Sequence, residues 1–413
     1  MNFKALKNPY LLFLPFLLFF IIFVFLFHTN SNEGDEGRYL MFAQNLLHGF
    51  YSPPPPDINL WNGPGYPIAL TPFVGLRLPL ICITLMNAVF YYLSIVFLFK
   101  ALIKIVSFRE AFTFSLFWAC FFNAFQKIPR ILSETFTIVL ISLLIFFLLK
   151  AFGNKSSKYL FLSGFLIGYI ALTKIVFGYV LGFMLLGSIL LWIKKRNAIE
   201  YKKGLLILLI ALVVTAPYLI YTYHVTGRIF YWGNSGGTAL YWISTPYKSE
   251  FGDYLDGELP AGHQKFFTML ASYNGIARDD ALKRKALNNI KAHPLKFAQN
   301  WIANIGRLFF NFPYSPASDS VHHVGHPLRS LLMLPQNAVL FLLMAYSLLV
   351  TLWNWKSIVY HIRFLFCFVF LYLGASSVVS AYSRHFYVIV PALLLWIAYI
   401  ANHSLTIKIK FKK

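Results

Sequence analysis

The chain of 413 residues is 58% hydrophobic and 19% aromatic, and only 12% of its residues are charged, about half the share found in soluble globular domains. This composition excludes an ordinary soluble domain and indicates a multi-pass membrane protein. The formal charge of +22 does not indicate nucleic-acid binding, because the basic residues lie between apolar segments and at the C-terminus, as the positive-inside bias predicts. Cys82, Cys120 and Cys367 each lie within an apolar segment, which excludes a disulfide framework.

Apolar segments long enough to cross a bilayer recur along the chain. The first has two lysines before it and no cleavage signal after it, so we interpret it as a retained helix. The predicted spans cover about residues 9–27, 79–103, 111–126, 131–150, 158–172, 174–192, 204–223, 331–352, 359–378 and 385–402. The predicted fold class is therefore an all-α polytopic membrane protein with about ten transmembrane helices, within a range of eight to twelve.

The first span is followed by the acidic stretch GDEGRY, residues 34–39. Beyond it, Tyr39, Phe42 and Leu46 recur at helical spacing and Gly49 follows, which predicts a short amphipathic helix at the membrane interface. Asp35 and Glu36 fall at its start, so the simplest interpretation is an N-cap and a first-turn acid. Capping explains one carboxylate, and the adjacent pair leaves a functional role open.

A second motif in the same loop is WNGPGYP, residues 61–67. Its glycines and prolines predict an ordered turn, and the aromatic residues on either side are typical of the membrane interface. Two interpretations stay open for it: an interfacial anchor, or part of a sugar or lipid site.

Two long apolar runs are each divided by charge. In residues 111–150, Lys127, Pro129 and Arg130 predict a break, because proline disfavours helix before it and charges are costly at mid-bilayer. Residues 159–193 are too long for one span, and Lys174 lies near their middle. Two spans meeting at Thr173 and Lys174 also place the following basic residues on the same side as the N-terminus.

This threading predicts that both ends of the chain are cytoplasmic and that two large segments lie outside, residues 28–78 and 224–330. It divides the chain into an N-terminal transmembrane catalytic module (1–223), an extracytoplasmic region with amphipathic helices (224–330), and C-terminal helices with a basic tail (331–413). Most acidic residues then lie on the outer face.

Four more charged residues fall at the outer ends of spans: Arg130, Glu134, Lys174 and Arg384. The ordinary interpretations are an i,i+4 ion pair for Arg130 and Glu134, snorkelling for Lys174, and a boundary charge for Arg384. Together they would place cations and carboxylates at the level of lipid headgroups. That arrangement suits a lipid phosphate leaving group with a carboxylate base opposite it.

Metal binding has little support in the sequence. His322, His323 and His326 are weak candidates, and solvated loop histidines are the simpler interpretation. The sequence has no phosphate-binding glycine loop, nucleophile elbow or metalloprotease helix motif. We expect no required cofactor, and a divalent metal stays possible.

Several short motifs resemble, in order, those of the GT-C membrane glycosyltransferases, in particular the branch of the protein O-mannosyltransferases and the lipid A aminoarabinose transferase. They are DEGRY (35–39), NGPGYP (62–67), LSE (132–134), the glycine-containing segment 162–174 ending in Thr-Lys, the segment 216–236 beginning Ala-Pro-Tyr, and SRH (383–385). Tyr218 and His385 stand where the family commonly has tryptophan and tyrosine. NGPGYP replaces the Lys-Pro-Pro of the aminoarabinose branch.

The resemblance implies transfer of a sugar from a polyprenyl-phosphate carrier to a lipid, glycan or protein acceptor on the outer face of a bacterial inner membrane, with inversion at the anomeric carbon. On this reading Asp35 is the base and Glu36 supports it. The donor phosphate is held by Lys174, Arg384 and Arg130. The supporting residues are Glu134, Arg38, Tyr39, Tyr66 and His385. The alternatives are a transporter or flippase of lipid-linked sugar, and a non-catalytic outer-face subunit that would tolerate loss of both acids.

Overall fold

The computed structural model describes residues 8–30, 34–153, 156–194, 198–253, 259–311, 326–379 and 382–410, and all regular structure in these ranges is helical. The helices are α1 (Pro9–Leu12), α2 (Leu14–Phe27), α3 (Asp35–Leu47), α4 (Gly65–Gly75), α5 (Leu80–Leu102), α6 (Phe108–Ala119), α7 (Phe122–Phe125), α8 (Ser133–Gly153), α9 (Ser157–Thr173), α10 (Val176–Lys194), α11 (Ile199–Thr226), α12 (Gly236–Ile243), α13 (Ala261–Leu270), α14 (Gly275–Ala292), α15 (Pro294–Phe310), α16 (His326–Trp353), α17 (Tyr360–Ser377), α18 (Ser383–Tyr387) and α19 (Val390–Lys410).

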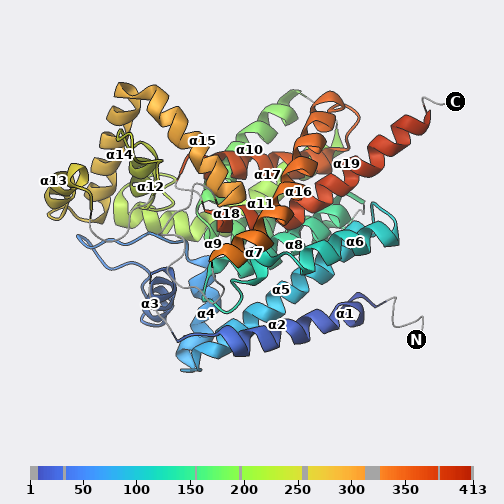
Figure 1. Ribbon diagram of the computed structural model, residues 1–413, viewed down its shortest axis with the longest axis horizontal. Helices are drawn as coiled ribbons and strands as arrows, with labels where there is room; N and C mark the ends of the chain where they lie inside the picture. Colours follow the sequence, from blue (N-terminus) through green and yellow to red (C-terminus); the bar gives the residue numbers. More distant parts are fainter. Residues whose placement is uncertain are drawn as a thin grey trace.

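Long apolar helices form the body of the molecule (Figure 1). Six of them, α5, α8, α10, α11, α16 and α17, are long and apolar enough to cross a membrane, and α2, α9 and the first part of α19 are shorter apolar helices. These nine correspond to nine of the ten predicted spans. The chain is therefore an all-α integral membrane protein, as the composition predicts.

Helix α8 lies at the centre of this bundle. In its most apolar stretch 72% of residues are buried, against 33% for α10 and α11 and 28% for α16, whose remaining apolar surface is left for lipid. Helix α9 packs closely on α11 through Gly164 and Gly168, where an added Cβ would come within 2.6 Å of Ile207 O and 2.8 Å of Ala211 O. Small residues four apart allow this close approach of two helices in a membrane.

Both predicted breaks are confirmed. Helix α9 ends at Thr173, Lys174 has an extended backbone, and α10 begins at Val176. Residues 126–132, which include Lys127, Pro129 and Arg130, lie outside helices. Charge in the middle of an apolar run therefore marked a real interruption of the helix in both cases.

The structure differs from the prediction at residues 111–126, where a single span is expected. It forms α6 and the four-residue α7, separated at Cys120 and Phe121. The segment still runs antiparallel to α5, since Phe108 contacts Phe99 at one end and Asn87 donates to Arg130 O at the other. The spans predicted at 9–27 and 385–402 are likewise interrupted, at Phe13 and at Val388 and Ile389.

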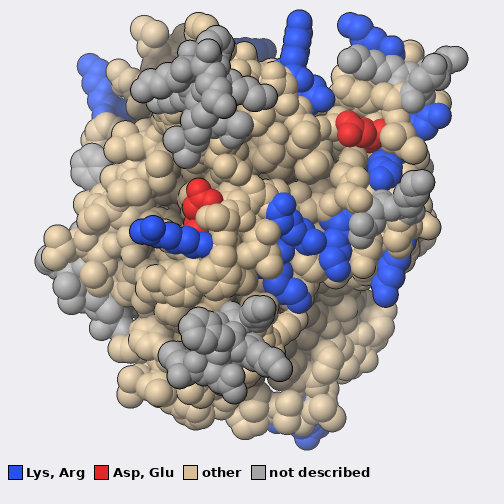
Figure 2. Space-filling view, turned by 90° about the vertical axis from the view of Figure 1, so that its right-hand side faces the viewer, with Lys and Arg blue, Asp and Glu red and all other residues tan. Residues whose placement is uncertain are grey.

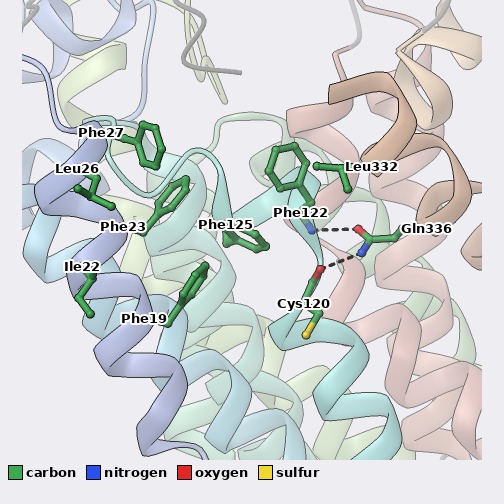
Figure 3. Close-up of a pocket in the computed structure, with 10 residues that line it drawn as sticks. All are labelled: Phe19, Ile22, Phe23, Leu26, Phe27, Cys120, Phe122, Phe125, Leu332 and Gln336. Carbon is green, nitrogen blue, oxygen red and sulfur yellow. Dashed lines mark hydrogen bonds between the residues drawn. The ribbon is translucent and has the colours of Figure 1, made fainter. Parts of the chain in front are cut away.

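The side chain of Gln336, on α16, hydrogen-bonds to the backbone groups left without helical partners at the break between α6 and α7. Its Nε2 donates to Cys120 O at 2.8 Å, and its Oε1 accepts from Phe122 N at 2.9 Å. Figure 3 shows this side chain reaching the break, beside a cavity of about 450 Å³ between α2, α7 and α16. Backbone groups inside a membrane need such partners, because lipid offers none.

The shorter helices gather at one end of the bundle. Figure 1 places α3 and α12–α15 on the side opposite α1 and the C-terminal end of α19. Helices α12–α15 fall within residues 224–330, and α4 forms where the sequence predicts only a turn. The other end, seen in Figure 2, has many lysines and arginines and few acidic residues at its surface.

Candidate functional site

The acidic stretch after the first span begins α3 in a way the capping interpretation did not predict. The N-cap residue is Gly34, with φ +60, and no side chain caps the helix. Asp35 is therefore not the N-cap, and that interpretation was wrong. Asp35 and Glu36 are both first-turn acids, and because successive helical residues point about 100° apart, the two carboxylates meet different partners.

Asp35 lies between two arginines. Arg384 Nη1 donates to Asp35 Oδ2 at 2.7 Å, and Arg38 pairs with Asp35 Oδ1. Burial alone would raise the pKa of this carboxyl, but Arg384, Arg38 and Lys174 outweigh burial and hold its pKa well below the usual range. The carboxylate is therefore firmly ionised.

Glu134 connects Arg384 to a further cation, Lys174. Lys174 Nζ donates to Glu134 Oε1 at 2.9 Å, and Arg384 Nε lies 3.9 Å from the same oxygen. Glu134 begins α8, Lys174 follows α9 and Arg384 lies on α18. The structure thus joins Asp35, Arg384, Glu134 and Lys174 in one chain of ion pairs drawn from four helices and their ends.

This cluster carries more positive than negative charge. Two carboxylates, Asp35 and Glu134, face three cations, Arg38, Lys174 and Arg384. The second oxygen of Glu134 is buried and has no hydrogen-bond partner within the described part of the chain. An additional anion would balance the cluster, so the arrangement can hold a phosphate.

Glu36 and Arg130 form a separate pair. Glu36 is 1% exposed; it pairs with Arg130 and also accepts from Ile131 N at 3.0 Å. This pair fixes the start of α3 to the non-helical segment before α8. The geometry favours a structural role for Glu36, and its supporting role in catalysis stays a prediction, as does phosphate binding by Arg130.

The NGPGYP turn holds Lys174 in place. At Gly63 an added Cβ would lie 2.0 Å from Leu172 O, and at Gly65 it would lie 2.5 Å from Thr173 Oγ1. Tyr169 Oη also donates to Gly65 O at 3.0 Å. The turn therefore packs directly on the end of α9, which is why it needs glycine at both positions.

Two predicted supporting residues line the same region. Tyr39 Oη donates to Ser133 Oγ at 2.9 Å and accepts from Asn62 Nδ2 at 3.2 Å. The rings of Tyr39 and Tyr66 meet edge to face, 5.0 Å apart. Asn62 also accepts from Arg38 Nε at 3.3 Å. The sequence analysis did not assign a site role to Asn62 or Ser133, although the motifs NGPGYP and LSE contain them.

Arg384 and His385 lie on α18, which is held by two neighbours. Tyr372 Oη donates to the backbone oxygen of His385 at 2.8 Å. Asn304 Nδ2 of α15 donates to Ser377 O at 2.6 Å and also to Val379 O, just before α18. No sequence motif marks Asn304 as a residue that supports the site, because it lies in an ordinary amphipathic helix.

The metal site suggested by three histidines stays a prediction. His322 and His323 lie outside the described residues, and only the backbone of His326 is described. Within the described ranges, no group of three His, Cys, Asp or Glu side chains could hold a metal ion.

These features define an integral membrane protein with a buried ion-pair cluster at one end of its helical bundle. Residues 78–221 match the model of the dolichyl-phosphate-mannose-protein mannosyltransferase family. This segment contains Arg130, Glu134 and Lys174. The resemblance to the GT-C glycosyltransferases is thereby confirmed over this segment of the chain.

Solved structures of other proteins are distantly similar to this chain. One is ArnT from Cupriavidus metallidurans bound to undecaprenyl phosphate, with 14% identity, a TM-score of 0.41, and coverage of 95% of this chain and 77% of that one. Another is the archaeal oligosaccharyltransferase AglB from Archaeoglobus fulgidus in complex with an inhibitory peptide and a dolichol-phosphate, with 12% identity, a TM-score of 0.47, and coverage of 94% of this chain and 50% of that one. No curated protein matches the sequence significantly.

Proposed function

We propose that this protein is a glycosyltransferase that moves a sugar from a polyprenyl-phosphate carrier to a lipid, glycan or protein acceptor. The reaction takes place where α3, α8, α9 and α18 meet, on the outer face of a bacterial inner membrane, with both chain ends cytoplasmic. One observation carries the proposal: Asp35 shares Arg384 with the Glu134–Lys174 pair. A candidate proton acceptor thus lies beside the cations that would hold a phosphate.

The donor phosphate binds to Lys174 and Arg384. A polyprenyl-phosphate sugar is a phosphodiester with one negative charge, and the phosphate gains a second charge as its bond to the sugar breaks. The excess positive charge of the cluster therefore stabilises the transition state more than the bound donor. Glu134 holds both cations in position until the phosphate arrives.

Asp35 accepts the proton of the acceptor hydroxyl while that oxygen bonds to the anomeric carbon and the carbon–phosphate-oxygen bond breaks. In the resting site Arg384, Arg38 and Lys174 keep the pKa of Asp35 low, which makes it a weak base. A phosphate that draws Arg384 and Lys174 toward itself weakens this effect and raises the basicity of Asp35. Donor binding thus precedes activation of the acceptor.

A single displacement of this kind inverts the anomeric centre. It needs no covalent enzyme intermediate, because a lipid phosphate is already a good leaving group. The other nearby carboxylate of α3, Glu36, is 1% exposed and paired with Arg130, so Asp35 is the proton acceptor in this scheme.

The test compares the wild type with Asp35→Asn in membranes supplied with labelled polyprenyl-phosphate sugar. We expect transfer to fall by about 10²- to 10⁴-fold, the usual contribution of a positioned base. Asp57→Asn is the matched control, since Asp57 lies in the same loop and is exposed. Transfer at the wild-type rate by Asp35→Asn would contradict the catalytic role. Movement of lipid-linked sugar across the membrane without transfer would instead support a flippase.

A further inference from the structure

Three lysines converge on one aromatic ring at the end of the bundle opposite α3. Lys100 and Lys104 come from the end of α5 and the turn after it, and Lys150 from the last turn of α8. Their Nζ atoms lie 5.4, 6.0 and 4.7 Å from the centroid of the Phe146 ring. Phe146 itself is 6% exposed, so the three ammonium groups gather around a ring that is almost completely buried.

The partners of these lysines are neutral. Lys100 Nζ donates to Tyr10 Oη at 3.2 Å and Lys150 Nζ to Tyr159 Oη at 3.4 Å. Among the described residues, no carboxylate forms an ion pair with Lys100, Lys104 or Lys150. Glu110, the acidic residue nearest in sequence to α5, is engaged instead in the capping box of α6 with Ser107.

Helix dipoles and the positive-inside bias explain lysines at helix ends, but they do not explain this convergence. Lysines placed by those effects alone could extend apart into water. Here the three ammonium groups gather around one ring, at 4.7, 5.4 and 6.0 Å from its centroid. Like charges gathered around one ring repel one another, and a bound anion would offset that repulsion.

We propose that Lys100, Lys104 and Lys150 bind the phosphate group of an anionic phospholipid. Two tyrosines flank the site, as expected at the level of lipid headgroups. Beside Tyr10, the apolar side chains of Leu11 and Leu14 are 53% and 39% exposed, which provides a surface for an acyl chain next to the cations. Basic pockets between membrane helices are known to bind lipid headgroups.

This site is separate from the proposed donor site, which lies at the α3 end of the bundle. Figure 2 shows the face at the end where the lysines lie, with basic side chains distributed over it. Lipid binding by the three lysines does not depend on sugar transfer at the α3 end, and sugar transfer does not depend on lipid binding. Stability and lipid retention can therefore test the lysine site independently of sugar transfer.

The test uses the purified full-length protein in nanodiscs of phosphatidylcholine alone or of phosphatidylcholine mixed with phosphatidylglycerol. The variant is the triple change Lys100→Gln, Lys104→Gln and Lys150→Gln. The matched control changes Lys158, Lys194 and Lys202 to Gln, three exposed lysines at the same end that remove the same charge. Thermal unfolding and native mass spectrometry of retained lipid are measured for each.

We expect phosphatidylglycerol to raise the unfolding temperature of the wild type and of the control, and retained phosphatidylglycerol to be several-fold lower for the site variant. An equal loss in the control would overturn the proposal, because the attraction would then be diffuse. Equal effects of the two lipid compositions on the wild type would also overturn it. A third arm adds inorganic phosphate in pure phosphatidylcholine, and full stabilisation there would assign the site to soluble phosphate instead.

Discussion

The two ends of the helical bundle differ in the partners of their positively charged side chains. At the α3 end, Arg38, Arg130, Lys174 and Arg384 each form an ion pair with a carboxylate. At the other end, Lys100 and Lys150 contact aromatic rings and tyrosine hydroxyls, and Lys104 lies over the Phe146 ring. The first arrangement holds cations at fixed positions, and the second leaves them available to an external anion.

This difference distinguishes cations that are held at defined positions by ion pairs from cations that can attract an external anion. Fixed pairs suit a site where a phosphate must take over from a carboxylate at a defined place, as we propose for Glu134 and Lys174. Unpaired lysines at helix ends suit a surface that only needs to attract a headgroup. Four predictions test the α3 end of this comparison, in order of decreasing effect.

The largest effect is expected from Glu36→Gln. Glu36 is almost completely buried and pairs with Arg130, and removal of one partner of a buried pair typically costs about 3–5 kcal/mol. Thermal unfolding in detergent should show a strong loss of stability, and the double change with Arg130→Gln should restore part of it. Unchanged stability of the single variant would mean that this pair does not fix α3.

Arg384→Lys should reduce kcat/KM for the lipid-linked donor by about 10- to 100-fold, because lysine keeps the charge but loses the planar group that serves both Asp35 and Glu134. Transfer kinetics at varied donor concentration measure the effect. Arg228→Lys is the matched control, since Arg228 forms its pair with Asp280 elsewhere. A similar loss in both variants would contradict a specific role for Arg384.

Gly63→Ala should destabilise the protein by about 1–3 kcal/mol, the usual cost of overpacking, because its Cβ would lie 2.0 Å from Leu172 O. It should also raise the donor KM, since Lys174 follows the same helix end. Gly187→Ala in α10 is the control, where an added Cβ meets nothing within 4 Å. If the two variants unfold alike, the turn does not position Lys174.

The smallest effect is the acid sensitivity contributed by Asp35. Its pKa is lowered in the folded protein, so its ion pairs stabilise the fold fully above the unfolded value of about 3.9 and lose this contribution as the pH falls below it. Unfolding temperatures should be measured from about pH 6 to about pH 3, a range that includes the unfolded pKa of an aspartate. Over this range the unfolding temperature should fall less steeply for Asp35→Asn than for the wild type. Parallel curves would show that Asp35 is not held by its arginines.

The sequence allowed the membrane helices to be predicted because their lengths follow from the thickness of the bilayer and from the cost of charge within it. Lys174 therefore marked the turn between α9 and α10 correctly. The break between α6 and α7 was not predictable, because the group that satisfies it belongs to Gln336, 214 residues from Phe122. Likewise, the basic ends of α5 and α8 were visible in the sequence, but their convergence on Phe146 was not.

The sequence by itself determined that this is an all-helical membrane protein, where its chain reverses, and which charged residues lie at helix ends, because these depend on local hydrophobicity. Only the tertiary structure decided which charges meet. Asp35 pairs with Arg384, 349 residues away, whereas its neighbour Glu36 pairs with Arg130, 94 residues away. The reason is geometric: adjacent residues of a helix point in different directions, and the packing of distant helices determines what each one finds there.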